Sequence, residues 1–388
     1  MWEGDGMTER IYDLDSHQQA FDAQVRTCVQ TKAGWETVLE STAFFPGGGG
    51  QAADTGTLAG LQVLSVYERD DDVVHVLPAE VSGVVHGQLD WAARFERMQA
   101  HSGEHVVSGI VHRLYGYENV GFHMGTDGVV VDFSGWINQD GLDEIERLAN
   151  AAVTRNLRVR VWYPTAEERA SMAYRSKKEL TGRVRIVEME EIDRCACCAP
   201  HVQRTGEIGL IKILDSVRHK DGIRITLLCG QAAFEDYRMK AQQVAGAGAL
   251  LSAKPDRVVE AVRRTQEELE RLTHQVITLK RQAAESIALT LPCQDGNLCV
   301  FVPDFDAEQL RTVVNRGMER CTGICAAFSG TDGDYRYIMG SKTVNLRQNA
   351  RAINEAIAGR GGGRPEMIQG SAVATRVEIE HYFDTVLL

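Results

Sequence analysis

Two pairs of residues with the same spacing constrain this chain more than any other feature. His101 and His105 stand four residues apart at the start of an apolar, helix-like run, and Cys197 and His201 stand four apart in a later cysteine-rich segment. Residues four apart lie on one face of a helix, so each pair can hold one side of a metal ion. Three imidazoles and one thiolate are a ligand set that suits tetrahedral zinc. We therefore predict that the two segments meet around one zinc ion.

The spacing alone leaves the choice of thiol open. Cys195, Cys197 and Cys198 all lie close to His201 in the sequence. Cys197 has the four-residue spacing and is the preferred ligand, whereas Cys198 could reach the ion if the segment forms a turn. Glu104 stands between the two histidines, but a His-Glu-x-x-His protease places its glutamate directly after the first histidine. We therefore expect Glu104 to face solvent or to support a ligand.

The composition is that of a globular protein large enough for two or three domains, with 388 residues, 44% hydrophobic and 25% charged. Nine cysteines, three of them between positions 195 and 198, indicate thiols and metal ligation more than a disulfide framework. Residues 1–13 carry no continuous apolar run, and no stretch of the sequence is apolar over the length of a membrane span. We therefore expect a cytoplasmic protein with no membrane partner.

One basic segment stands out in a chain whose net charge is −12. An acidic chain does not bind nucleic acid non-specifically, because such binding depends on neutralising phosphates. Positions 171–185 nevertheless hold five basic residues against one acid, and this strip is either a local RNA contact or a solvated surface. The basic residues are Arg175, Lys177, Lys178, Arg183 and Arg185.

The N-terminal part is expected to be rich in strands. Residues 21–31 and 61–68 alternate apolar and polar side chains between turn residues, which predicts half-buried strands. We assign residues 1–92 to a β-rich, barrel-like domain. Four glycines at positions 47–50 add no side chain to a core, so they serve backbone freedom or the close approach of another group. A flexible hairpin loop is the simpler alternative.

Residues 93–238 mix helical and antiparallel strand patterns without a regular strand-helix repeat, which favours an α+β fold. Positions 91–115 and 142–154 have helical spacing, and positions 121–135 predict a strand pair with a turn at Thr126-Asp127-Gly128. Two further strand-like runs, at 210–217 and 223–228, predict a hairpin turning at Asp221-Gly222.

A long helical arm, assigned to residues 239–290, is expected to follow. Apolar residues between Val262 and Ala283 alternate at spacings of three and four, as in a coiled-coil seam. Such a seam packs on the neighbouring helix at 232–251 or on a second chain, and a plain surface helix is the alternative. Residues 291–388 form a separate α/β unit.

A second glycine-rich segment lies in this C-terminal unit. Gly361–Gly363 stand beside Arg364, so backbone amides and a guanidinium could hold a phosphate there. A single glycine-rich loop has low specificity, and by itself it does not assign a function.

The motifs HSGEH, CCAPHV and TGEIG, preceded by FFPGGGGQAADTG, resemble the editing domain of alanyl-tRNA synthetases and of the free-standing AlaX alanyl-tRNA editing proteins. The resemblance implies that a glycine-rich GGQ segment lines an aminoacyl pocket beside zinc. Carried over by position, the zinc ligands are His101, His105, Cys197 and His201. The pocket segment comprises Thr42, Gly48, Gly49, Gly50 and Gln51, of which Thr42, Gly49, Gly50 and Gln51 are the expected catalytic group.

The resemblance covers nearly the whole chain. A long helix followed by GGGRPEMIQGS is similar to the C-Ala domain that alanyl-tRNA synthetases share with DHH-type phosphoesterases, so the chain resembles the long form of AlaX. Two departures concern details of the pocket. The family often has an acidic residue where this chain has Gly47, and Cys195 and Cys198 are extra thiols.

The resemblance implies a trans-editing hydrolase that deacylates mischarged tRNA(Ala). The expected substrate is chiefly Ser-tRNA(Ala), with Gly-tRNA(Ala) second, and Thr42 is placed to bond the serine hydroxyl. Four protein ligands are typical of structural zinc, so a catalytic and a structural role of the ion both stay open. The alternatives are a non-catalytic tRNA-binding protein and an aminoacyl esterase for another charged tRNA.

The expected partners are misacylated tRNA(Ala) and a second copy of the chain, bound as a homodimer through the helical arm or the C-terminal domain. Contacts between basic side chains and phosphates would make the affinity for tRNA depend on salt. The candidate tRNA contacts are Arg175, Lys177, Lys178, Arg183, Arg360 and Arg364.

Overall fold

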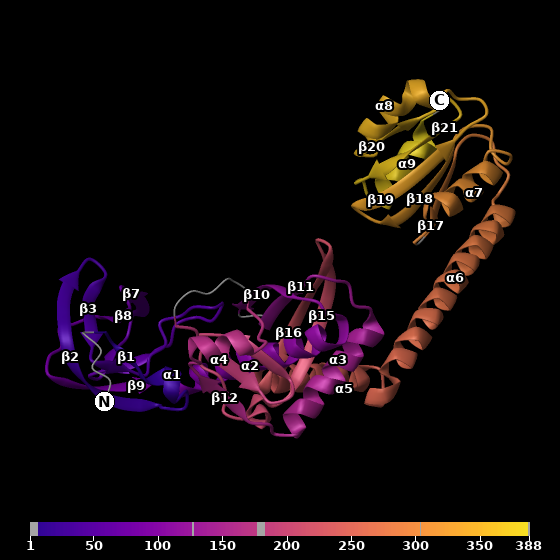
Figure 1. The fold of residues 1–388 in the computed structure, drawn as a ribbon. Coiled ribbons are helices and arrows are strands. Elements are labelled where there is room, and N and C mark those ends of the chain that lie inside the picture. The colour runs from indigo at the N-terminus through magenta and orange to yellow at the C-terminus, as the bar shows by residue number, and fades with distance from the viewer. Residues whose placement is uncertain (1–6, 126–127, 177–182, 303, 387–388) are drawn as a thin grey trace. The chain divides into compact units, whose positions relative to one another are not determined.

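The structure is a computed structural model that describes residues 7–125, 128–176, 183–302 and 304–386. The chain forms two compact units, Met1–Val244 and Ala245–Leu388. Both contain helices and sheets (Figure 1), so the α+β class expected from the sequence is confirmed. The finer division into four domains stays a prediction.

The first unit begins with a seven-stranded sheet in the order β6-β5-β9-β2-β3-β8-β7. Alternate residues of β9 are buried, as expected of a strand with one face on a core. A short parallel pair, β1 with β4, and a one-turn helix lie beside it. The bounds are β1 Glu9–Arg10, α1 Ile11–Leu14, β2 Ala20–Thr31, β3 Gly34–Leu39, β4 Ser41–Thr42, β5 Gly56–Leu58, β6 Leu61–Gln62, β7 Ser65–Arg69, β8 Asp72–Leu77 and β9 Val84–Leu89.

Two expectations for this region need correction. The strand predicted over 61–68 is two strands, because β6 pairs with β5 and β7 pairs with β8. Between them, the Val63 amide donates to Gly56 and the Leu64 amide to Val76. The sheet is also open, since β6 and β7 form its two edges and do not pair with each other among the described residues. The alternation of side chains predicts strands but carries no information about closure, so the expected barrel is not found.

The rest of the first unit packs helices against two small antiparallel sheets, β10-β11-β16-β15 and β12-β13-β14. Helix α2 contacts α3, β11, β14 and β16, and Figure 1 shows it in the middle of this region. The bounds are α2 Trp91–Tyr115, β10 Asn119–Gly125, β11 Gly128–Phe133, α3 Gln139–Thr154, β12 Val159–Trp162, α4 Ala166–Ser171, β13 Ile186–Met189, β14 Asp193–Ala196, η1 Thr205–Ile208, β15 Ile211–His219 and β16 Gly222–Cys229.

Local chemistry sets the ends of α2 and tertiary packing buries its middle. Asp90 caps the helix by accepting the Ala93 N–H, and Gly116 ends it with a left-handed backbone at φ 68°. All residues from 101 to 111 are buried. A polar side chain in such a run needs partners, because an unpaired buried polar group costs free energy.

The strand pairs expected from the sequence are confirmed. β10 pairs with β11 and β15 pairs with β16, both antiparallel. The second hairpin joins His219 to Gly222, with Lys220 in a left-handed conformation at φ 50°. The turn proposed at Thr126-Asp127-Gly128 lies mostly outside the described residues.

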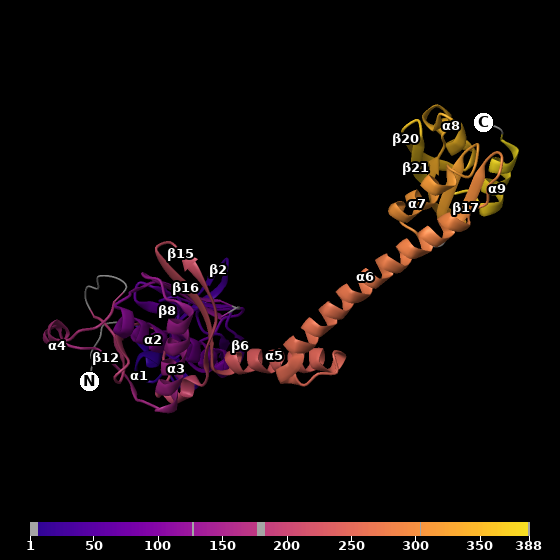
Figure 2. The ribbon, with the colours of Figure 1, turned by 90° about the vertical axis from the view of Figure 1, so that its right-hand side faces the viewer.

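The second unit holds a long helix and a five-stranded sheet in the order β17-β18-β19-β21-β20. Figure 2 shows α6 as one uninterrupted helix that leads into this sheet. Helix α5, Gly230–Leu250, precedes it and ends beyond the boundary of the first unit. The bounds are η2 Pro255–Arg257, α6 Val258–Thr290, β17 Leu298–Val302, α7 Ala307–Gly317, β18 Cys325–Thr331, β19 Asp334–Gly340, α8 Leu346–Ala356, β20 Gly359–Gly363, β21 Met367–Ala372 and α9 Arg376–Thr385.

Two features of the second unit differ from a simple reading of the sequence. The glycines at 359–363 form strand β20, where a side chain at Gly361 would collide with the Tyr337 hydroxyl. The seam along α6 is exposed: Val262, Leu272 and Leu279 are at least 41% accessible, which leaves the surface-helix and two-chain alternatives open. None of the described helices combines the length and apolar character needed to cross a membrane.

Candidate metal centre and adjoining cavity

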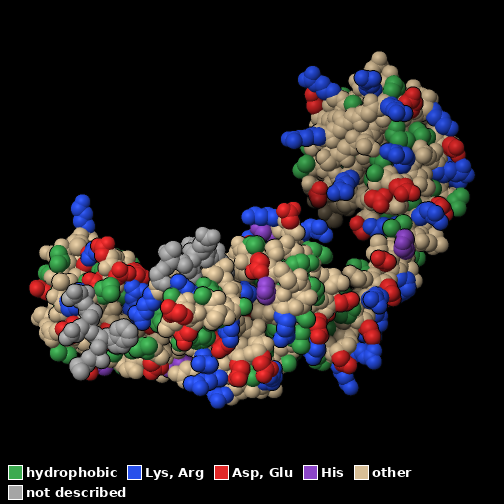
Figure 3. Space-filling model, viewed as in Figure 1, with side chains coloured by type: hydrophobic (Ala, Val, Ile, Leu, Met, Phe, Trp, Pro, Cys, Tyr) green, Lys and Arg blue, Asp and Glu red, His purple; other side chains and the backbone are tan. Residues whose placement is uncertain are grey.

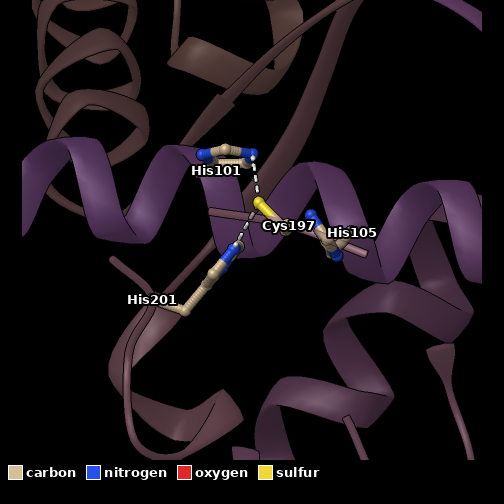
Figure 4. A group of neighbouring side chains, drawn as sticks. All are labelled: His101, His105, Cys197 and His201. Carbon is tan, nitrogen blue, oxygen red and sulfur yellow. Dashed lines mark hydrogen bonds between the residues drawn. The ribbon is translucent and has the colours of Figure 1, made fainter. Parts of the chain in front are cut away.

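Helix α2 presents two of the four candidate ligands. His101 and His105 are one helical turn apart, both are buried, and their ring centres lie 5.3 Å apart. The ring of His201 lies 4.7 Å from that of His101 and 4.6 Å from that of His105. The three imidazoles therefore surround a common point, as Figure 4 shows.

Cys197 completes the group from the loop that follows β14. Its Sγ lies 3.6 Å from Nε2 of His101 and 3.3 Å from Nε2 of His201. One ligand atom from each of the four residues falls within 4.8 Å of the others. Nitrogen and sulfur ligands on one tetrahedral zinc ion lie roughly 3.3–3.7 Å apart, given the usual metal–ligand bond lengths. The predicted set can therefore hold a metal ion.

Arg185 holds the cysteine loop in place. Its guanidinium donates to the carbonyl oxygens of Cys197 at 2.9 Å and Ala199 at 2.7 Å. Ala199 also packs with Tyr12 of α1 and with Phe45, which lies two positions before the glycine-rich segment at 47–50. The loop is therefore fixed to the same wall as that segment.

The outer nitrogen of each imidazole has an oxygen partner. Nδ1 of His101 lies 2.9 Å from Gln51 Oε1, and Nδ1 of His201 lies 3.0 Å from Ser102 Oγ. Nδ1 of His105 lies 3.2 Å from Asp193 Oδ2, although the angle is poor for a regular hydrogen bond. A proton on Nδ1 leaves Nε2 free for a metal, so these partners orient the ligands.

Charge supports the same assignment. Burial opposes ionisation of Cys197, but the neighbouring imidazoles of His101 and His201 outweigh it and lower the thiol pKa well below its usual range. Burial raises the pKa of Cys195 and of Cys198 to about 11. Only a thiolate is a strong metal ligand. Cys197 is therefore the thiol best suited to an ion, and Cys198 lies outside the four-residue group.

Asp193 is an ionised carboxylate behind His105. Arg175 donates to both of its oxygens, each at 2.7 Å. Burial would raise the carboxyl pKa, but the contacts with His105 and Arg175 outweigh it and hold the pKa at about 2. The Arg175 side chain is only 12% exposed. It belongs to a chain of contacts that runs through Asp193 to His105.

The glycine-rich segment forms a tight turn. Gly48 and Gln51 exchange backbone hydrogen bonds of 3.0 Å, and Gly47 to Gly50 all have positive φ. A side chain at Gly50 would also collide with the ring of Phe122. Only glycine fits this backbone without strain, so the segment is a defined turn in this structure, not a flexible loop.

A buried ion pair ties this turn to α2. Asp54 accepts the Phe45 N–H at 2.7 Å and receives Nε of Arg94 at 2.9 Å. Arg94 also donates to the carbonyl oxygen of Ala43. Both charged side chains are at most 1% exposed. Neither residue carries a local sequence signal, since the Asp and the Arg stand forty positions apart.

A cavity of about 630 Å³ lies over the four-residue group. Arg10, Tyr163 and Arg183 belong to the less buried part of its lining, and the Arg183 guanidinium stacks 3.9 Å from the Tyr163 ring centre. The cavity therefore has a cationic rim and a metal-binding wall. The rest of the lining includes the exposed Gly49 and Gly50 and the less exposed His101, Glu104, His105, Phe122, Arg175 and Cys197.

The structure does not bring all predicted residues to the cavity. Thr42 is fully buried, bonds His75 at 2.9 Å, accepts the Phe44 N–H and does not line the cavity. Gln51 supports His101 from outside the lining. Of the two alternatives for Glu104, the solvent-facing one is wrong, because the residue is only 2% exposed.

The predicted RNA contacts fall in different places. Arg175 and Arg183 line the cavity, while Lys177 and Lys178 lie outside the described residues. Arg360 in β20 and Arg364 after it are exposed in the second unit. On the face shown in Figure 3, basic and acidic side chains are interspersed and form no extended basic surface.

Comparison with known proteins covers nearly the whole chain. The alanyl-tRNA editing protein AlaX-L of Pyrococcus horikoshii is 24% identical over 98% of this chain and 98% of its own. The editing protein Aarsd1 of Danio rerio is 26% identical over 94% of this chain and 95% of its own. The chain is a homologue of the alanyl-tRNA editing proteins. The resemblance inferred from the sequence motifs is thus confirmed.

Other matches concern parts of longer or shorter proteins. Residues 184–226 match the family described as the threonyl and alanyl tRNA synthetase second additional domain. The alanine–tRNA ligase of Pyrococcus furiosus is 29% identical over 94% of this chain, which spans only 42% of that ligase. The C-Ala domain of the Aquifex aeolicus alanyl-tRNA synthetase matches at 20% identity and a TM-score of 0.20, over 23% of this chain and 87% of that domain.

Proposed function

We propose that this protein is a trans-editing hydrolase that deacylates mischarged tRNA(Ala), chiefly Ser-tRNA(Ala) and secondarily Gly-tRNA(Ala). The observation that carries this proposal is the group of three imidazoles and one thiolate on the wall of a 630 Å³ cavity. Cavities of this size accommodate small ligands. The homology to alanyl-tRNA editing proteins supports the choice of reaction and tRNA.

The donor set suits one zinc ion, held by His101, His105, Cys197 and His201. Zinc bound there would supply a Lewis acid and fix its ligands in space. Four protein ligands are typical of a closed site, so in this proposal the ion chiefly holds the cysteine loop against α2. The chain's own groups then act on the ester.

The glycine turn supplies hydrogen-bond donors. The backbone amides of Gly48 and Gln51 are paired with each other's carbonyl oxygens, which leaves the amides of Gly49 and Gly50 beside the cavity. Preorganised N–H donors stabilise the oxyanion that forms when water attacks an ester carbonyl. We assign this role to Gly49 and Gly50, with Gln51 holding His101 in place.

Substrate contacts follow from the same geometry. Arg10 and Arg183 at the rim are placed to meet the phosphates of the tRNA acceptor end, and Arg175 positions Asp193. Lys177, Lys178, Arg360 and Arg364 stay proposed tRNA contacts. Thr42 would bind the serine hydroxyl only by giving up its hydrogen bond to His75. We therefore assign it a structural role, in which its hydroxyl oxygen accepts the Phe44 N–H and fixes the backbone before the glycine turn.

The test is a deacylation assay on Ser-, Gly- and Ala-tRNA(Ala) and on other charged tRNAs, with zinc content measured. Wild-type protein should cleave Ser-tRNA(Ala) fastest and spare Ala-tRNA(Ala). Cys197→Ala should lose zinc and at least about 100-fold of the rate, since even the outer partners of metal ligands contribute about 10–100-fold. Cys293→Ala, at an exposed thiol, is the matched control.

Three outcomes would count against the proposal. Equal rates on Ser- and Ala-tRNA(Ala) would remove the editing claim, and preference for another charged tRNA would favour a different esterase. Full activity without metal would remove the role of the four ligands. Tight tRNA binding with no hydrolysis would favour a non-catalytic tRNA-binding protein.

A further inference from the structure

Glu104 is a buried carboxylate whose two oxygens differ in their surroundings. Its Oε1 accepts hydrogen bonds from Ser108 Oγ and Asn119 Nδ2, each at 2.5 Å. Its Oε2 has no hydrogen-bond donor among the described residues, and Nε2 of His105 lies 3.9 Å from it. Glu104 lines the cavity beside His101 and His105. One oxygen is therefore fixed, and the other is available to a ligand.

No lysine or arginine among the described residues forms an ion pair with this carboxylate. His105, at 3.9 Å, is proposed as a metal ligand and is then uncharged. Glu104 is the only acid among the described residues that line the cavity. The lining guanidiniums are engaged elsewhere. They are Arg10 with Glu68, Arg175 with Asp193, Arg183 on the ring of Tyr163, and Arg185 with backbone carbonyls. A buried carboxylate without a cationic partner is costly, so a ligand that brings a positive charge would be favoured there.

We propose that Glu104 binds the α-ammonium group of the aminoacyl ester. This inference rests on the proposed function, because an aminoacyl ester carries its ammonium on the carbon next to the scissile carbonyl. With that ammonium at Oε2 of Glu104, the carbonyl lies on the side of Gly49 and Gly50, and the anionic phosphates lie toward Arg10 and Arg183. The charges of the cavity match those of the substrate from end to end.

The test replaces the charge on each side of this contact. Glu104→Gln keeps the acceptor for Ser108 and Asn119 but removes the negative charge. Glyceryl-tRNA(Ala), the ester of glyceric acid, has a neutral hydroxyl where Ser-tRNA(Ala) has its ammonium. For Glu104→Gln we expect kcat/KM on Ser-tRNA(Ala) to fall on the order of 10–100-fold, as for a lost charge-assisted hydrogen bond, and kcat/KM on glyceryl-tRNA(Ala) to change less than about twofold.

Other roles of Glu104 give different results. An equal fall on both esters would overturn the proposal, because a purely structural role does not distinguish the substrates. Loss of zinc from Glu104→Gln would overturn it too, since the carboxylate would then belong to the metal site. Glu118→Gln, at an exposed carboxylate paired with His112, is the control and should leave both rates unchanged.

A binding measurement separates this inference from the proposed reaction. The probes are the non-hydrolysable seryl and glyceryl amides of 3′-amino-3′-deoxyadenosine, titrated calorimetrically into wild-type protein and Glu104→Gln. The inference is supported if the wild type binds the seryl amide more tightly than the glyceryl amide and Glu104→Gln does not, even if no ester is hydrolysed. Hydrolysis by the wild type without any preference for the ammonium would defeat the inference alone. Failure to bind either amide would defeat it as well.

Discussion

Individual side chains decide which nitrogen of each histidine faces the candidate ion. Gln51, Ser102 and Asp193 contact the Nδ1 atoms of three histidines, so all three Nε2 atoms point to one centre. These partners come from the glycine turn, from α2 itself and from β14. Sequence spacing identifies the candidate ligands but not the residues that orient their rings. Two of these residues, Gln51 and Asp193, lie far in sequence from the histidines they contact.

At this scale we predict that Gln51→Met weakens zinc binding. The substitution keeps the volume but removes the oxygen that faces Nδ1 of His101, and loss of such an outer partner lowers metal affinity about 10–100-fold. Competition with a chromophoric chelator measures the affinity. Gln30→Met, at an exposed position, is the control, and unchanged zinc affinity in Gln51→Met would show that Gln51 does not hold His101.

At the scale of elements, the Asp54–Arg94 pair joins the glycine turn to α2. The turn provides the amides of Gly49 and Gly50, and the helix provides His101 and His105. Arg94 also donates to the backbone carbonyl oxygens of Ser16, which follows α1, and Ala43, which follows β4. The Asp54–Arg94 ion pair therefore links the two parts of the cavity lining, the glycine turn and α2.

We predict that Asp54→Asn lowers the free energy of unfolding by about 3–5 kcal/mol, because it leaves the Arg94 charge buried without its carboxylate. The change is measured by urea denaturation, from the unfolding transition of the unit Met1–Val244, which contains both residues. The double variant Asp54→Asn with Arg94→Met should recover part of it, and Asp22→Asn, at an exposed ion pair, should change little. A loss below about 1 kcal/mol in Asp54→Asn would show that the pair is unimportant.

At the scale of the whole molecule, α6 offers an apolar seam to a partner. Leu269, Leu272, Val276 and Leu279 share this seam and are all exposed. The end of the helix is anchored differently, since Ala284 packs in the core that contains residues of α7. An exposed seam of coiled-coil spacing supports the prediction of a homodimer through the arm.

We predict that light scattering gives about twice the chain mass of 42.9 kDa. Leu272→Glu together with Leu279→Glu should shift the protein to the single-chain mass, because two charges would lie in the apolar seam. His274→Glu, on the opposite side of the heptad, should leave the mass unchanged. A wild-type protein that scatters as a single chain would reject the dimer.

Local sequence patterns were sufficient to predict the elements whose signal lies within one short segment. The spacing of His101 and His105 and the apolar run around them predicted α2 and its ligand pair, and alternation predicted the β15–β16 hairpin. The four glycines predicted an unusual backbone, and the motifs predicted the family. Each of these signals is contained within about 25 residues, the length over which one element repeats its own geometry.

The partners of the site side chains depend on tertiary contacts. For Glu104 the sequence left a solvent-facing and a ligand-supporting role open, and the burial of α2 against α3, β11, β14 and β16 excludes the first. Arg175 was expected to contact RNA or to lie on a solvated surface, whereas in the structure it pairs with Asp193. Alternation of side chains does not show whether the N-terminal sheet is open or closed. The sequence also gives no sign that Thr42 is buried in a hydrogen bond to His75. All of these depend on contacts between residues far apart in the chain, and side-chain spacing along one segment does not encode them.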